Sequence, residues 1–315
     1  MLNPLIRAAS EIWSAGSGLS RLLATIGITR CVRLPVRVVS VGNIQAGGAG
    51  KTPLVAQIAR EAHDRGLRVC ILSRGYGGKW ERVGGLISPL ETQEPLLTAD
   101  CGDECALLRT LAPHAFIAVG ADRIRQFRRA QESGAEIDLV ILDDGFQNRR
   151  IRKDLEIVAV TSASPWKVLH RDSKSALAHA DLLVWTKGET LPDSDGSAAP
   201  MVKVRFAVTG PEKAGPVWLV AGVADGESVL TSARQAGYEI SRSFLFPDHA
   251  IYTDQQVREI LGTARRTGKR VALTGKDWVK WREFGVRPDE VIVLEVVVEF
   301  VSGRESWVRA LWGSE

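Results

Sequence analysis

Apolar runs alternate with stretches of helical spacing along most of the chain. From Val36 onward the runs are VRVVSV, VCILS, AFIAV, DLVILDD, LEIVAV and DLLVWTK, and helical patterns lie between them at 52–63 and 122–132. Strands this apolar are buried on both faces, which is typical of a parallel sheet wrapped by helices. The pattern predicts an α/β domain with a doubly wound, mostly parallel sheet and helices on both faces.

Two polar loops rich in Gly and Pro interrupt this pattern. GETLPDSDGSAAP covers 188–200, and TGPEKAGP follows one further strand, at 209–216. Beyond them VWLVAGV, EISRSFLF, RVALTG and EVIVLEVVV alternate with helical patterns near 227–236 and 253–267, which predicts a second, smaller α/β domain. We therefore expect one domain at 31–210 and another at 211–315, with the last helix packing on either of them.

The first 30 residues carry apolar side chains at helical spacing, among them Leu5, Ile12, Leu19 and Ile26, with several arginines nearby. A membrane span needs roughly 20 consecutive apolar residues. Because Glu11 interrupts the run, we expect neither a secretory signal nor a transmembrane helix. Residues 1–30 are interpreted as an amphipathic helical segment that either packs on its own domain or lies on a membrane surface.

The overall charge does not indicate a nucleic-acid partner. The 315 residues include 41 Lys and Arg against 37 Asp and Glu, a net charge of +4, whereas nucleic-acid binding requires a strong basic field. The four cysteines, at 31, 70, 101 and 105, have neither C-x-x-C spacing nor the density of a disulfide scaffold. We expect them to be free thiols in a reducing compartment.

The strongest chemical signal follows the first strand. In VRVVSVGNIQAGGAGKTP an apolar strand leads into a Gly-rich turn, and a helix begins at its end. Backbone amides of such a turn bind phosphates, the lysine reaches the β and γ phosphates, and the threonine hydroxyl binds magnesium. The usual G-x-x-x-x-G-K-[ST] pattern has its first glycine where this chain has Gln45. The alternative, a flexible glycine linker, does not explain the flanking strand and helix. The pattern predicts ATP and Mg²⁺ as cofactors, bound by Gly47, Gly48, Gly50, Lys51 and Thr52.

A pair of carboxylates, Asp143 and Asp144, ends the strand IDLVILDD. P-loop enzymes keep a magnesium-binding carboxylate at this position, and ligands of parallel sheets gather at the carboxyl ends of the strands. Taken alone, two aspartates after a strand are more often a solvated turn. The phosphate-binding pattern upstream favours the magnesium interpretation.

Two further motifs have both a functional and a local structural interpretation. Asp103 and Glu104 open a helix, and taken alone N-capping explains them better than a catalytic role does. His249 follows Asp248 in FPDHAIYT, and the pair is either a base with its orienting carboxylate or part of a turn.

Taken in order, these motifs resemble the tetraacyldisaccharide 4′-kinase family. The resemblance runs from about Leu34 to Asp277 and rests on RLPVRVVSVGNIQAGGAGKTP, ILSRGYGG, GDE, VGADR, ILDDGFQ, ADLLVWTK, FPDH-x-x-YT and LTGKDWVK. It implies ATP-dependent phosphorylation of the 4′-hydroxyl of a tetraacylated glucosamine disaccharide 1-phosphate, a lipid A precursor, in lipopolysaccharide biosynthesis. It further implies a monomeric, peripheral enzyme at the cytoplasmic face of the bacterial inner membrane, which contacts the membrane through its N-terminal helix.

The resemblance also implies roles for individual residues. Asp103 is the base, assisted by His249, and Lys51 completes the catalytic group. The positions matching the magnesium and water network are Thr52, Glu104, Asp143, Asp144 and Gln147. The positions expected to contact substrate are Ser73, Arg74, Tyr76, Asn148 and Arg171.

Several motifs depart from the family pattern. The family's GDEP, FQHR and doubled histidine read here as GDEC, FQNR and His249-Ala250, and its GPLREP loop keeps only Arg171 and, conservatively, Asp172. Two alternatives therefore stay open. One is a P-loop switch or metallochaperone-type NTPase. A guanine-specific N-K-x-D motif would favour this alternative, and the sequence has no such motif. The other is a kinase for a different sugar, suggested by the altered loop.

Overall fold

The computed structural model of the protein describes residues 4–27, 30–45, 48–89, 96–162, 170–192, 194, 196–211 and 215–313. Its strands are β1 (Arg37–Asn43), β2 (Val69–Ser73), β3 (Gly85–Ile87), β4 (Phe116–Val119), β5 (Leu139–Asp143), β6 (Leu155–Thr161), β7 (Leu182–Lys187), β8 (Met201–Thr209), β9 (Val217–Gly222), β10 (Ile240–Phe246), β11 (Arg270–Thr274) and β12 (Val291–Ser302).

The α-helices are α1 (Pro4–Thr25), α2 (Lys51–Asp64), α3 (Trp80–Val83), α4 (Thr98–Cys101), α5 (Asp103–Leu111), α6 (Arg123–Glu132), α7 (Gly226–Gln235), α8 (Asp254–Arg266), α9 (Gly275–Trp281) and α10 (Arg304–Trp312). Short 3₁₀ helices are η1 (Lys174–His179), η2 (Arg282–Phe284) and η3 (Pro288–Glu290).

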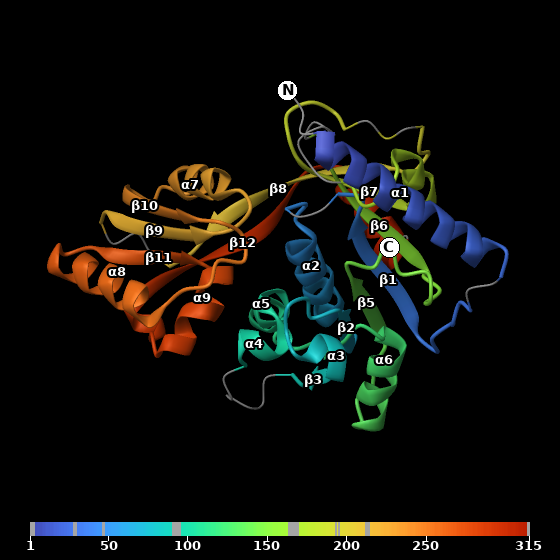
Figure 1. Cartoon of the computed structure of the whole chain (residues 1–315), viewed down its shortest axis with the longest axis horizontal. Helices are drawn as coiled ribbons and strands as arrows, with labels where there is room; N and C mark the ends of the chain where they lie inside the picture. Colours follow the sequence, from blue (N-terminus) through green and yellow to red (C-terminus); the bar gives the residue numbers. More distant parts are fainter. Residues whose placement is uncertain are drawn as a thin grey trace.

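All of these strands belong to one sheet, in the order β10-β9-β11-β12-β8-β7-β6-β1-β5-β2-β4-β3 (Figure 1). Within it, β8 pairs antiparallel with β12 and β3 with β4, whereas the other described neighbours are parallel. The predicted α/β class with a mostly parallel sheet is therefore confirmed.

The smaller unit predicted at the C-terminal end shares this sheet and has no sheet of its own. The reason is the length of β12, which pairs with β11 at Val291–Leu294 and then with β8 at Glu295–Ser302. The sequence predicted a strand over EVIVLEVVV, residues 290–298, but neither its extension to Ser302 nor its antiparallel pairing with β8. The boundary expected at residue 210 stays a prediction. We call β1–β8 with their helices the first part of the molecule, and β9–β11 with α7–α9 the second part. β8 ends at Thr209, but β12 and α10 carry the chain back onto the first part (Figure 1).

Helices cover both faces of the sheet because alternate residues of each strand point to opposite sides. In β1, Val39 and Val41 pack into the cluster that contains α2 and α5, whereas Val38 packs into the cluster that contains Phe127 of α6. The polar end of β1 is thereby held rigidly between two apolar layers. All four cysteines are free, as expected, and three of them are buried.

The last helix, α10, packs on the first part of the molecule, which answers a question that the sequence left open. Its anchor is the buried carboxylate of Glu61 in α2, which accepts hydrogen bonds from Arg304 at 2.6 Å, Trp307 at 3.0 Å and Trp312 at 2.9 Å. Burial by itself raises the pKa of Glu61, but these hydrogen bonds and one from Gln57 outweigh it and lower that pKa. Glu61 is therefore held as an ionised anchor.

The N-terminal helix, α1, turns its polar side to the body. The fully buried Asp172 accepts hydrogen bonds from Ser17 Oγ at 2.7 Å and from Arg21 Nη2 at 2.6 Å. Large apolar side chains elsewhere on the helix are exposed: Ile12 and Leu19 on the opposite side, and Trp13 and Leu22 toward its flanks. A surface helix of a globular protein usually has the reverse arrangement. Among the described helices none is long and apolar enough to cross a bilayer.

The turn between β1 and α2 requires glycine at position 50. Gly50 has φ +75°, in the left-handed region, and a Cβ built there would lie 2.2 Å from the ring of Phe206 in β8. The turn is thus packed directly against the antiparallel pair β8 and β12 that joins the two parts.

We expect Gly50→Ala to destabilise the protein and to impair nucleotide binding, because the methyl group meets both the strained backbone and the Phe206 ring. Gly66→Ala is the matched control, since Gly66 has the same φ of +75° but nothing within 4 Å of its Cβ position. That control should cost only the conformational term of about 1–2 kcal/mol. Thermal unfolding and ATP calorimetry measure both effects. Equal losses in the two variants would show that contact with Phe206 is unimportant.

Candidate active site

The phosphate-binding turn follows the end of β1 and contains two glycines in the left-handed conformation. Gly48 and Gly50 both have positive φ, at 51° and 75°, and Gly47 lies outside the described residues. The ammonium of Lys51 lies 3.3 Å from Asn43 Oδ1 and 3.5 Å from Asp144 Oδ1. The first residue of α2 is thus folded back over the turn, where it faces the polar ends of β1 and β5.

The two consecutive aspartates at the end of β5 have different surroundings. Asp143 is buried and accepts a hydrogen bond from Ser73 Oγ at 2.8 Å. Burial, then the charge of Asp144, raises the pKa of Asp143. Asp144 instead has φ +51° and forms a two-point ion pair with Arg171, at 2.7 and 3.2 Å. Burial opposes its ionisation, but Lys51 and Arg171 outweigh burial and lower its pKa.

Arg171 joins the turn to the carboxylates. Besides Asp144, its guanidinium donates to Asn43 Oδ1 at 2.9 Å and to the carbonyl of Gln45 at 3.2 Å. An arginine that forms a planar, two-point contact fixes geometry as well as charge. Arg171 therefore lies at the nucleotide side of the site in this structure.

Glu104, at the start of α5, approaches the same region from the other side of the turn. Burial, then the charge of Asp143, raises the pKa of Glu104 to about 7. Buried carboxylates that raise one another's pKa are stabilised when a cation lies between them. Thr52 lines the same cleft as Glu104, and its hydroxyl together with the carboxylates makes an oxygen donor set that fits Mg²⁺.

Protein side chains supply only part of such a site. Within the described ranges no group of three or more His, Cys, Asp or Glu side chains is arranged to hold a metal ion. Mg²⁺ usually keeps waters and substrate phosphates as its remaining ligands, so an incomplete set is what a phosphoryl-transfer site requires. Gln147 donates from Nε2 to the carbonyl of Asn43 at 3.0 Å, which places its amide next to the turn.

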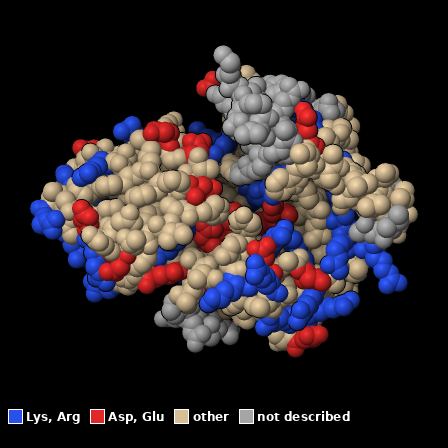
Figure 2. Space-filling view, in the orientation of Figure 1, with Lys and Arg blue, Asp and Glu red and all other residues tan. Residues whose placement is uncertain are grey.

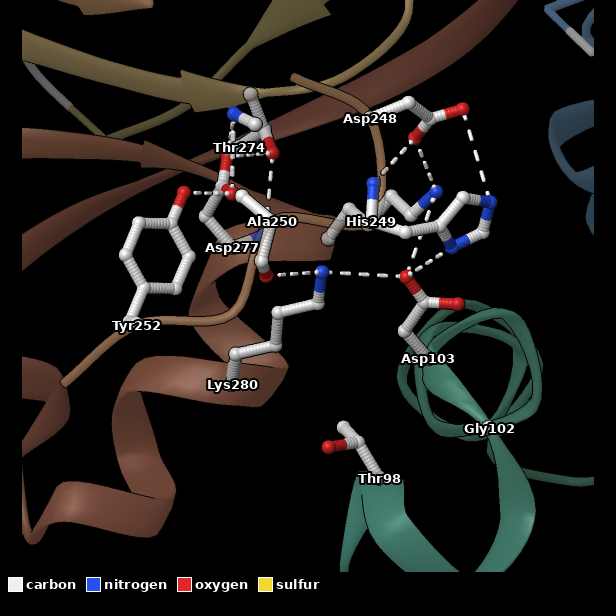
Figure 3. Close-up of polar contacts among 12 residues, drawn as sticks. Thr98, Gly102, Asp103, Asp248, His249, Ala250, Tyr252, Thr274, Asp277 and Lys280 are labelled. Carbon is white, nitrogen blue, oxygen red and sulfur yellow. Dashed lines mark hydrogen bonds and ion pairs between the residues drawn. The ribbon is translucent and has the colours of Figure 1, made fainter. Parts of the chain in front are cut away.

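Asp103 lies where three groups from the second part of the molecule converge (Figure 3). Its Oδ2 lies 3.0 Å from His249 Nδ1, 3.2 Å from Lys280 Nζ and 3.4 Å from Lys276 Nζ. Burial raises the pKa of Asp103, but the two lysines, followed by His249, outweigh it and lower that pKa. Because an ionised carboxylate can only accept, Nδ1 of His249 carries the hydrogen of this bond.

A cleft of about 240 Å³ runs from the turn to Lys276, which contacts Asp103, and to Asp248, which precedes His249. One wall consists of 48–53 with Glu104, and the other of 223–225 and 274–276 with Asp248. Its apolar surface comes from residues including Phe206, Val208, Val229, Val293 and Val296. Acidic and basic side chains gather in the hollow between the two parts (Figure 2). The cleft thus combines an apolar section with a strongly polar end, which suits a nucleotide.

The structure brings most of the predicted site residues together. Lys51, Thr52, Glu104, Gly48 and Gly50 line the cleft. Asp143, Asp144, Gln147 and Arg171 lie beside the turn, where the cleft begins, through the contacts given above. Asp103 and His249, which the resemblance pairs as the base and the residue that assists it, are in direct contact.

The residues predicted to contact substrate are more dispersed. Ser73 is buried behind Asp143, and Arg74 is ion-paired with Glu81 at 2.7 Å. Asn148 accepts from the backbone amides of the turn that follows it, at 3.0 and 3.3 Å. Tyr76 is exposed, with its ring centroid 6.4 Å from that of His249. Of these four, Tyr76 is the residue whose position beside Asp103 and His249 suits substrate contact.

Sequence reasoning did not assign roles to Asn43, Lys276 and Lys280. Asn43 is a buried polar residue at the carboxyl end of a strand, which is itself a signal for a ligand site in this fold. The two lysines are four residues apart in LTGKDWVK and lie on one side of α9. Nothing local in the sequence shows that this side faces Asp103, which is more than 170 positions away.

Comparisons with known proteins agree along the whole chain. A family model described as tetraacyldisaccharide-1-P 4′-kinase matches residues 2–313. The tetraacyldisaccharide 4′-kinase of Geobacter metallireducens is 33% identical over 89% of this chain and 90% of its own. That of Parvibaculum lavamentivorans is 35% identical over 78% of this chain and 73% of its own. The crystal structure of LpxK from Aquifex aeolicus in complex with ATP has a TM-score of 0.76 and 26% identity, covering 96% of this chain and 95% of that one.

Removing the charge of Lys280 should raise the pKa of Asp103, because one of the two cations that lower it is lost. If the ionised carboxylate is the active form, the acid limb of kcat should move to higher pH in Lys280→Met, by about 1–3 pH units. Lys280→Arg keeps the charge and should leave the limb in place. Measuring kcat from acid to neutral pH tests this, and an unmoved acid limb in Lys280→Met would contradict it.

Proposed function

The chain belongs to the tetraacyldisaccharide-1-P 4′-kinase family, and we propose that its Asp103–His249 pair and its phosphate-binding turn transfer the γ-phosphate of ATP to the 4′-hydroxyl of a tetraacylated glucosamine disaccharide 1-phosphate. The activity is that of a tetraacyldisaccharide 4′-kinase, a step of lipid A biosynthesis. The observation that carries the assignment of the site is the 3.0 Å contact between Asp103 and His249 beside the cleft that starts at the turn.

ATP binds in the cleft with its phosphates on the turn. The backbone amides at Gly48 and Gly50, with the ammonium of Lys51, neutralise phosphate charge. We assign Thr52, Asp143 and Glu104 to Mg²⁺, which, when bound there, would neutralise charge on the phosphates. Asp144 has another role, because its carboxylate is already engaged by Lys51 and Arg171. The carboxylate of Asp144 holds the side chains of Lys51 and Arg171 in place along the phosphates.

The acceptor hydroxyl reaches Asp103 at the polar end of the cleft. As its oxygen attacks the γ-phosphorus, a new O–P bond forms, the bond to the bridging oxygen breaks, and ADP leaves. The hydroxyl proton passes to Asp103, which the two lysines hold ionised and His249 orients through Nδ1. Phosphoryl transfer requires little covalent work from the protein, so positioning and charge carry most of the rate.

We assign α1 to peripheral contact with the membrane that carries the lipid substrate. Its polar side chains Ser17 and Arg21 are bonded to Asp172 of the protein body. Its exposed surface carries Ile12, Trp13, Leu19 and Leu22. Exposed apolar area of this kind is stabilised when it is buried at a lipid interface. The arrangement supports peripheral contact with a lipid surface; from the family we further propose that this is the cytoplasmic face of the inner membrane and that the protein acts as a monomer.

The central test is transfer of labelled phosphate from ATP to the tetraacyl disaccharide monophosphate in the presence of magnesium. Asp103→Asn and His249→Ala should each lower kcat by about 10²–10⁴ with ATP affinity unchanged. The double variant should be much less damaged than the product of the two losses, because the pair acts as a unit. Asp100→Asn removes a nearby carboxylate that pairs with Lys79 and should leave kcat unchanged. If the kcat loss of the double variant equals the product of the two single losses, Asp103 and His249 do not act as a coupled pair.

The membrane assignment is tested with the triple variant Ile12→Gln, Leu19→Gln and Leu22→Gln. We expect it to stay in the supernatant when anionic phospholipid vesicles are sedimented, because the apolar side of α1 is gone, while ATP affinity is retained. The control is Leu191→Gln with Val301→Gln, which changes exposed apolar residues elsewhere and should sediment like the unmodified protein. Continued sedimentation of the triple variant would place the lipid contact on another surface.

A further inference from the structure

The segment that carries His249 is a short strap, residues 247–252, between β10 and α8. His249 has φ +57°. Among the non-glycine residues of the described ranges, only His249 and Asp144 have a left-handed backbone conformation. Such a conformation costs free energy for a residue with a Cβ and persists only where the surroundings fix it. The contacts that fix the strap therefore determine where the imidazole points.

Three side chains of α9 hold the strap (Figure 3). Lys276 donates to Asp248 at 2.7 Å, on one side of His249, and Lys280 donates to the carbonyl of Ala250 at 3.0 Å, on the other. Asp277 accepts from the hydroxyl of Tyr252 at 2.6 Å, at the end of the strap. The two lysines also contact Asp103, so one helix positions both members of the catalytic pair.

Asp277 is the fixed point of this arrangement. It is fully buried, and besides Tyr252 it accepts from Thr274 Oγ1 at 2.6 Å and from the amide of Gly222 at 3.0 Å. Gly222 ends β9 and Thr274 ends β11, so the carboxylate ties both α9 and the strap to the ends of two core strands. These donors satisfy a carboxylate whose burial would otherwise be costly.

The end of β9 is shaped for this contact. A Cβ built at Gly222 would lie 2.6 Å from the hydroxyl oxygen of Tyr252 and 2.7 Å from Asp277 Oδ1. Only glycine lets the backbone amide reach the carboxylate while the tyrosine hydroxyl is also bound. The Tyr252 ring packs separately, edge-on against Phe246 and Trp281, with centroids 5.2 and 5.7 Å away. Packing and the hydrogen bond can therefore be separated by mutation.

We propose that Asp277 and Tyr252 are positioning residues for the proton-accepting pair: through the strap they hold the imidazole of His249 at hydrogen-bond distance from Asp103. Neither lines the cleft, and neither contacts Asp103 or His249, so they act through the strap. This inference rests on the proposed function, since it assigns no role to the strap unless His249 assists Asp103.

The first test is Tyr252→Phe, which removes one hydroxyl and keeps the ring. Its matched control is Tyr238→Phe, because Tyr238 is equally buried in the same part of the molecule and donates to the carbonyl of Pro211 at 2.8 Å. We expect Tyr252→Phe to lower kcat about tenfold, the order of effect of one lost buried hydrogen bond, with KM for ATP unchanged. Tyr238→Phe should lose comparable thermal stability and keep its kcat.

A spectroscopic readout separates positioning from general destabilisation. The chain has five histidines, so ¹⁵N spectra of histidine-labelled protein can be assigned by comparison with His249→Ala. In the unmodified protein Nδ1 of His249 should have the shift of a protonated nitrogen. In Tyr252→Phe that signal should move toward the average of the two tautomers, and in Tyr238→Phe it should stay in place. An unmoved signal in Tyr252→Phe would overturn the positioning role.

The decisive comparison uses the His249→Ala background. If Tyr252 acts through His249, adding Tyr252→Phe to His249→Ala should lower kcat no further. A further tenfold loss there would overturn the inference and leave the proposed function standing. Full kcat in His249→Ala alone would instead overturn the proposed role of the pair. Asp277→Asn and Gly222→Ala should lower kcat in the same direction as Tyr252→Phe, and where they fail to fold, the tyrosine variants keep the test intact.

Discussion

The buried carboxylate of Asp103 is where the two parts of the molecule meet. It belongs to α5, in the first part, and the groups that contact it, His249, Lys276 and Lys280, come from the second. A buried charge without partners would be costly, so its ionised state depends on the second part being in place. The same contacts orient the carboxylate that we propose as the acceptor of the proton. Closure of the cleft and readiness for catalysis are thus one physical condition.

At the other end of the cleft, charge is divided between neighbouring residues. Burial and the charge of Asp144 raise the pKa of Asp143, and desolvation and the charge of Asp143 raise the pKa of the partly exposed Glu104, whereas Asp144 is neutralised by Lys51 and Arg171. The left-handed backbone at Asp144 turns its side chain away from that of Asp143. Two adjacent aspartates therefore contact different partners: Asp143 the hydroxyl of Ser73, and Asp144 the cations of Lys51 and Arg171.

The parts of this design that depend on local pattern were predictable from the sequence. The strand, turn and helix around Lys51 follow from apolar runs and glycines, and the Asp103–His249 pair followed from resemblance alone. The roles of Lys276 and Lys280 were not predictable, because they depend on which side of α9 faces a helix far away in the chain. The single sheet was missed for a similar reason: nothing in the sequence of β12 (Val291–Ser302) shows that its second half pairs with β8.

The helix α1 has a consequence for handling the protein in water. Its polar side is fully engaged by Asp172, so the helix cannot rotate to hide Ile12, Leu19 and Leu22 without breaking a buried ion pair. In buffer without lipid or detergent, the most accessible cover for that apolar side is the same surface of a second copy. The apparent oligomeric mass measured under those conditions should therefore depend on the detergent or lipid concentration. Such a mass reflects the conditions of measurement and not a native assembly.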